Sequence, residues 1–350
     1  MSRPILSRWF SKVGLVSLAW SQIAGGWSYD FLNMAPSARS AALGGLAWPG
    51  APDLGAVAQN PALLSEALHR SFQFTFQPYL ADVVSSFVTY GHTWSGVGTF
   101  WTGLQYIHYG AIPYTDEFGN RLGTFYAYEG TLMGGAGRSF GRWRVGMNLK
   151  FPFSALSLDR YWRVGIGTDV GVLYEDTLRG LAVSAVLRNV GTELYRPQGR
   201  SLAQPFPTSI QTTVSYRVPH APFRVHVGFI HLERWRMAYN DPLQPVRYDL
   251  LGNPLPPPPP KWTEHLFRHV VAGVEMLPDK PFTLRLAYHV QRRRELNPVG
   301  SQALGGLSAG VGLRARRWTL DYGYVLFFRR AAAHNFSLTV RPFRTQAQHE

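Results

Sequence analysis

The stretch Trp318-Thr319-Leu320-Asp321-Tyr322-Gly323-Tyr324-Val325-Leu326 decides the fold class, because large apolar side chains alternate in it with small or polar ones. Side chains that alternate with a period of two point to opposite faces of a β-strand. The same pattern occurs at 72–77 and at 336–341, so it runs through the chain from about residue 71 onward. The sequence therefore predicts a body built from β-strands.

The same alternation predicts fourteen strands. They cover 71–78, 83–91, 97–108, 124–136, 143–152, 163–175, 179–189, 208–217, 222–232, 265–276, 281–291, 304–314, 316–327 and 334–342. Most are close to the ~9–11 residues that a tilted membrane strand requires, or somewhat longer. Links after even-numbered strands are short, whereas most links after odd-numbered strands are long, for example 109–123.

Short turns at one end and long loops at the other are typical of outer-membrane barrels. Only a closed barrel places strands in lipid without an unpaired edge. We therefore predict an all-β fold, a 14-stranded antiparallel transmembrane β-barrel over 71–350. A secreted β-sandwich or solenoid is the alternative, but it explains neither the loop pattern nor the many aromatic residues near strand ends.

The composition excludes several classes of protein. The 350 residues are 45% hydrophobic and 16% charged, which is too apolar for a disordered chain. The chain contains no cysteine, which excludes disulfides, thiolate metal sites and cysteine nucleophiles. No run of 18 apolar residues occurs, so a helical membrane bundle is excluded. The net charge of +14 is scattered along the chain, and we expect no nucleic-acid binding.

Residues 1–21 have the pattern of a secretory signal peptide. Arg3, Arg8 and Lys12 precede a short apolar stretch at 13–20, and Ala19-Trp20-Ser21 fits a cleavage site. The chain is therefore expected to leave the cytoplasm and, with the predicted barrel, to reside in a bacterial outer membrane.

The segment 22–70 differs from the strands that follow. It is rich in small residues between positions 35 and 45, and Asn60-Pro61 starts a predicted helical turn. Small residues suit close packing against the inside of a barrel, so we predict that this segment forms a plug, or hatch, in the lumen.

Candidate catalytic and metal-binding patterns do not fit their surroundings. Gly306-Leu307-Ser308-Ala309-Gly310 matches the nucleophile-elbow spacing, but a strand follows it where that chemistry requires a helix. We predict no catalytic residue, cofactor or metal site. Carboxylates such as Glu275 and Asp321 are expected to lie in the lumen opposite arginines such as Arg285.

Residues 29–45 (YDFLNMAPSARSAALGG) and 58–64 (AQNPALL) resemble the start of the PorQ and PorV-like outer-membrane proteins of the bacterial type IX secretion system. The resemblance implies a FadL-like barrel with an N-terminal hatch. The hatch residues that it assigns are Phe31, Leu32, Asn33, Pro36, Ser37, Arg39, Gly44, Gly45, Asn60 and Pro61.

The resemblance also implies a function. It implies a non-enzymatic anchor that holds a PorZ-like surface protein in an attachment complex with PorU- and PorV-like members, near lipopolysaccharide. The alternatives are FadL-like transport of hydrophobic small molecules and a PorV-like cargo shuttle.

Two long links, 233–264 and 292–303, are the predicted docking surface for a partner. Aromatic side chains are effective interface anchors, a proline run is already stiff, and arginines suit acidic partners or lipopolysaccharide phosphates. The predicted partner-binding residues are Trp235, Tyr239, Tyr248, Pro256, Pro258, Trp262, Arg292, Arg293 and Arg294.

Overall fold

The computed structural model describes residues 28–79, 82–157, 161–195, 204–238, 247–249, 251, 253–255, 258–296, 304–328 and 331–341. The predicted signal peptide lies outside these residues. None of the helices in this part of the chain is both long enough and apolar enough to cross a bilayer.

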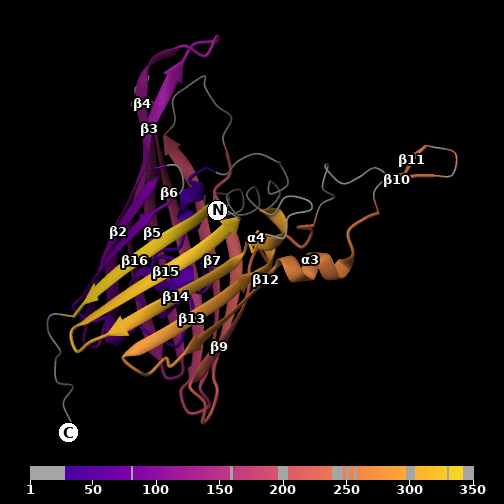
Figure 1. Cartoon of the computed structure of the whole chain (residues 1–350). Coiled ribbons are helices and arrows are strands. Elements are labelled where there is room, and N and C mark those ends of the chain that lie inside the picture. Colours follow the sequence, from indigo (N-terminus) through magenta and orange to yellow (C-terminus); the bar gives the residue numbers. More distant parts are fainter. Residues whose placement is uncertain are drawn as a thin grey trace, which may run out of the picture.

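Fourteen antiparallel strands form a closed barrel (Figure 1). They are β1 (Ser71–Pro78), β2 (Val84–Trp94), β3 (Gly98–Thr115), β4 (Arg121–Phe140), β5 (Trp143–Leu156), β6 (Tyr161–Asp176), β7 (Leu181–Tyr195), β8 (Ser209–Arg217), β9 (Phe223–Phe229), β12 (Val270–Met276), β13 (Phe282–His289), β14 (Leu307–Arg314), β15 (Trp318–Phe328) and β16 (Ala331–Val340). The first and last strands pair, with Phe74 opposite Leu338, and close the ring. The predicted fold class is confirmed.

The barrel wall has its apolar side chains on the outside. In β1, Phe72, Phe74 and Phe76 are 39–49% exposed, whereas Gln73 and Thr75 are buried on the inner face. A water-soluble sheet buries its large apolar residues, and a membrane barrel turns them toward lipid. The outward aromatic and aliphatic surface is therefore the lipid-facing wall.

The wall is taller on one side than on the other. Strands β3 and β4 have 18 and 20 residues, and their hairpin extends well beyond the rest of the barrel in Figure 1. On the opposite side, β12 has only seven residues. The predicted loop at 109–123 is therefore wrong at its two ends, because strand pairing continues to Thr115 and resumes at Arg121.

Two segments near the loop end of the short side are helical. Helix α3 (Trp262–Arg268) replaces the first residues of the strand predicted at 265–276, and α4 (Val290–Glu295) replaces the start of the loop predicted at 292–303. Within the long link, β10 (Arg247–Tyr248) and β11 (Pro254–Leu255) form a small separate hairpin. The predicted proline rod therefore begins as a paired strand.

Residues 28–70, which we call the plug, lie in the barrel interior and form short helices. These are η2 (Asp30–Asn33), α2 (Ala38–Ala42), η3 (Gly55–Ala58), η4 (Pro61–Leu63) and η5 (Glu66–Leu68). The plug starts at the loop end, where the Ser28 N–H donates to the Pro205 carbonyl at 3.0 Å. It finishes at the turn end, where β1 begins at Ser71. It therefore runs along the length of the barrel.

Candidate functional site: the contact between plug and barrel wall

Helix α2 packs directly against the wall because both partners lack bulky side chains. Ser37 caps the helix by accepting a hydrogen bond from the Ser40 N–H at 3.0 Å. The helix contacts strands β13 to β16. A Cβ atom added to Gly310 would lie 2.4 Å from the Ala42 Cβ, and one added to Gly323 would lie 2.5 Å from the Ala38 carbonyl oxygen. Glycine at these wall positions therefore permits the close approach.

Two glycines with a left-handed backbone conformation follow the end of α2. Gly44 and Gly45 have φ angles of 85° and 93°, which residues with a Cβ rarely adopt. The turn brings Trp48 back to the end of α2, where its indole N–H donates to the Leu43 carbonyl at 2.8 Å. Trp48 is fully buried, so this end of the plug is fixed by packing as well as by hydrogen bonds.

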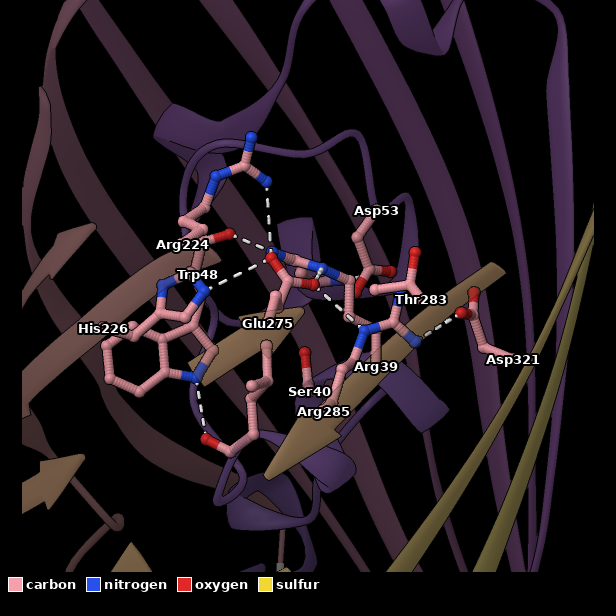
Figure 2. A network of polar contacts seen from close by, with 12 residues as sticks. Arg39, Ser40, Trp48, Asp53, Arg224, His226, Glu275, Thr283, Arg285 and Asp321 are labelled. Atoms are coloured by element: carbon pink, nitrogen blue, oxygen red, sulfur yellow. Dashed lines mark hydrogen bonds and ion pairs between the residues drawn. The ribbon is translucent and has the colours of Figure 1, made fainter. Parts of the chain in front are cut away.

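A buried network of charged side chains joins the plug to the wall (Figure 2). The Arg39 guanidinium of α2 donates two hydrogen bonds to the Glu275 carboxylate of β12, each 3.0 Å long. Arg285 of β13 also donates to Glu275 at 3.0 Å, and to Asp321 of β15 at 2.5 Å. On the other side, Arg224 of β9 lies 3.3 Å from Glu275.

This network places opposite charges where water cannot solvate them. Glu275 is 1% exposed, Arg39 3% and Arg285 4%. His226 contributes a neighbouring ring nitrogen 3.2 Å from a Glu275 oxygen. Removing one member of a buried ion pair leaves its partner uncompensated, which is far more costly than losing a surface pair. Glu275 thus binds one plug arginine together with arginines of two further wall strands.

A second polar contact holds the opposite side of the plug. Lys150 of β5 lies 2.8 Å from the Asp169 carboxylate of β6, and both side chains are buried. The Asn148 amide donates to Asp169 at 3.0 Å and to the Val57 carbonyl of the plug at 2.8 Å. Helix η4 packs against β4, β5 and β6 on this side. The plug therefore contacts opposite arcs of the wall and spans the lumen.

The interior space beside this network is small and polar. At the turn end, a cavity of about 100 Å³ opens between plug and wall. Its lining includes Arg39, Asp53, Arg285, Arg314, Asp321 and Arg341. Such a lining suits water or a small anion rather than a hydrocarbon. Apolar plug residues pack in clusters with the wall, such as the one formed by Leu54, Val57, Leu64 and wall residue Trp101.

The structure describes all ten predicted hatch residues, and several of them lie at these contacts. Phe31 and Leu32 are buried at the loop end beside Ile107 and Phe206. The Asn60 side chain accepts from the Ala62 N–H at 3.1 Å and caps η4, where Pro61 is the first residue. Asn33 and Pro36 lie between these two regions of the plug, while Ser37, Arg39, Gly44 and Gly45 act as described above.

The predicted partner-binding residues that the structure describes do not form one surface. Trp235 and Trp262 lie at the loop end, with ring centroids 5.8 Å apart, and Pro258 is exposed. Tyr248 lies in β10, and Tyr239 and Pro256 are outside the described residues.

The three predicted docking arginines also separate. Arg292 points toward the plug: its guanidinium nitrogen would be 2.7 Å from a Cβ on Gly45, and the guanidinium lies 5.8 Å from the Phe327 ring centroid. Burial lowers the pKa of Arg292. Arg293 is partly buried, and Arg294 is exposed. The arginine patch predicted at the rim is therefore wrong for Arg292.

The sequence alone did not reveal the main connection between plug and wall. Arg39 and Glu275 are 236 positions apart, and no local pattern indicates that they pair. The expectation of luminal carboxylates opposite arginines included Glu275, Asp321 and Arg285, but it did not include the bond from Glu275 to the plug.

No protein-family model matches the chain, and no curated protein is significantly similar to it. Solved structures are similar in fold. The toluene transporter TodX of Pseudomonas putida superposes with a TM-score of 0.53 at 14% identity, over 88% of this chain and 97% of that one. A deltaS2 mutant of TodX, described as a monoaromatic hydrocarbon channel, gives 0.54 at 14% identity, over 88% and 98%.

The chain has the barrel fold of TodX. A Pseudomonas aeruginosa FadL homologue is also similar, with a TM-score of 0.47 and 10% identity over 90% of this chain and 99% of that one. At this level of identity the likeness concerns the fold, and unrelated functions can share one fold.

Proposed function

We propose that this chain is a non-enzymatic outer-membrane anchor that holds a surface protein at the cell exterior. The observation that supports it best is the plug, which is attached to opposite sides of the lumen by the buried Arg39–Glu275 ion pair and by the hydrogen bond from Asn148 to Val57. A PorZ-like protein, with PorU- and PorV-like members of a type IX attachment complex, is the partner set that the N-terminal resemblance suggests.

The tall β3–β4 hairpin is the docking surface that we propose. It exposes Tyr114, Phe118 and Leu122, which are 43%, 89% and 60% exposed. Apolar side chains on the wall face lipid, but this hairpin extends past the length that a strand needs to cross the membrane. Exposed apolar residues beyond the membrane are expected to be covered by a protein partner.

Transport of small hydrophobic molecules is the second candidate. The fold shared with TodX favours it, and the comparisons support this alternative more than they support an anchor. Transport requires an apolar route through the barrel, so the plug, with Arg39, would have to move away from Glu275 on the wall. The two candidates therefore differ in whether the plug moves during function.

One experiment with the full chain separates them. The chain is purified from detergent-solubilised outer membranes, and the proteins that accompany it are identified for the native chain, a Phe118→Asp variant and a Val97→Asp control. Val97 is also exposed, at 55%, but lies in a short turn at the other end of the barrel. The anchor predicts a surface protein that is lost only with Phe118→Asp.

The same preparations are reconstituted into vesicles and tested for toluene uptake. Toluene uptake above that of empty vesicles would favour transport. The anchor would be refuted if, in addition, the same proteins accompanied the chain in all three preparations.

A further inference from the structure

Helix α3 lies outside the ring of strands, beside the point where β12 begins (Figure 1). It is joined to the wall by a single residue, His269, because β12 starts at Val270. Strands β12, β13 and β14 have seven, eight and eight residues, below the ~9–11 that a tilted strand needs to cross the hydrocarbon layer. On this side of the barrel, the segments that adjoin the strand ends are therefore expected to lie at the boundary between lipid and water.

The helix is amphipathic. At ~3.6 residues per turn, Trp262, Leu266 and Phe267 fall on one side of α3. Its polar residues, Glu264, His265 and Arg268, fall on the other side. The two sides have different surroundings.

Two residues of the polar side contact the link after β9 and helix α4. The His265 ring accepts a hydrogen bond from the Ala238 N–H at 3.0 Å, and Arg268 lies 3.6 Å from Glu295 of α4. At the end of the helix, the buried His269 ring contacts the Ile230 carbonyl at 2.6 Å. These contacts fix how the helix is rotated about its own axis.

The apolar side is therefore turned away from the protein. Trp262 is 61% exposed and Phe267 57% exposed, and Trp235, which is 44% exposed, lies against Trp262. A helix on a water-soluble surface does the reverse and buries its apolar side. On the wall, Leu286 and Tyr288 of β13, the strand next to β12, are likewise 49% and 38% exposed.

We infer that α3 is an interfacial helix whose apolar side is inserted among the lipid chains of the outer leaflet. Tryptophan is enriched at the boundary between lipid and water, and short amphipathic helices lie in that plane. Lys261 is exposed at the start of the helix and Arg294 on the neighbouring α4, where both can meet lipid phosphates. Trp235 and Trp262 then contact lipid rather than a docked protein.

Site-directed spin labelling tests this inference on the full chain in phosphatidylcholine–phosphatidylglycerol vesicles. The chain has no cysteine, so single cysteines can be introduced without background labelling. Phe267→Cys reports the apolar side of α3 and Glu264→Cys the polar side. Phe118→Cys is the matched control, because it replaces an exposed phenylalanine at the tip of the tall hairpin.

The measurement is the collision rate of each nitroxide with oxygen, which concentrates in lipid, and with a water-soluble nickel chelate. The ratio of oxygen to nickel accessibility should be severalfold higher at position 267 than at 118, with position 264 below 267. Equal nickel accessibility at 267 and 118 would overturn the inference, because the helix would then lie in water. A label at 267 that is shielded from both reagents would also overturn it.

Discussion

Replacing Glu275 with glutamine should loosen the plug, because this carboxylate is shared by three arginines. Arg39 and Arg285 each lie 3.0 Å from it and Arg224 lies 3.3 Å away. The amide is similar in size to the carboxylate but carries no charge. In Glu275→Gln, Arg285 keeps Asp321 as a partner, whereas Arg39 loses the carboxylate that binds it to the wall.

The expected cost follows from burial. Removing one partner from a buried ion pair typically destabilises a protein by about 3–5 kcal/mol. If the cost falls on the contact between plug and wall, the fraction of molecules with a displaced plug rises by a factor between about a hundred and a few thousand, since ~1.4 kcal/mol is tenfold.

Maleimide labelling of Ser40→Cys measures this fraction. Ser40 is fully buried on α2, and its hydroxyl has no hydrogen-bond partner among the described residues, so sulfur replaces oxygen without breaking a contact. Glu117→Gln, an exposed position on the β3–β4 hairpin, is the control and should leave the labelling rate unchanged. A less than tenfold increase in Glu275→Gln, in barrels that remain folded, would refute the reasoning.

Three further predictions concern packing, a second ion pair and pH. Gly310→Val should destabilise the barrel by about 1–3 kcal/mol, because the new side chain overpacks against α2. The melting temperature should fall. The control Gly123→Val should melt at the native temperature, because the space around Gly123 is open. Lys150→Met should lower the melting temperature further, because it leaves the buried Asp169 carboxylate unpaired; normal melting would count against that pair. Burial favours protonated Glu233, but hydrogen bonds from His231 and the Ile210 N–H outweigh it and lower its pKa. The stabilising contribution of ionised Glu233 should persist above pH ~4.3 and disappear as the pH falls through the lowered pKa. The hydrogen-exchange protection of the Ile210 amide should therefore fall in acid in the native chain. It should not fall in the Glu233→Gln variant.

The alternation of side chains predicted the barrel because its physical cause is local. Every strand must place one row of residues in lipid and the next in the lumen, and Phe72, Gln73 and Phe74 show this within three positions. Strand ends were harder to predict. Gly110 and Pro113 favour a loop, yet both lie within β3: Gly110 lies in an irregularity of the pairing, and Pro113 is paired with Thr124 of β4.

Other features could not be predicted because they depend on the whole fold. The aromatic residues of 262–268 fit a strand as well as a helix, and the helix makes contacts that are distant in sequence, from His265 to Ala238 and from Arg268 to Glu295. Arg292 was expected to face outward with its two neighbours. It points inward because α4 rotates successive side chains by ~100° and the plug offers space beside Gly45.

The path of the plug has a consequence for how the protein is assembled. The segment passes lengthwise through a ring that its own continuation completes, because β1 follows it directly and pairs with β16. A preformed ring would have to admit Arg39 and Trp48 through its lumen before they could reach their partners. We therefore expect the seam between the first and last strands to close late, around a segment already in place.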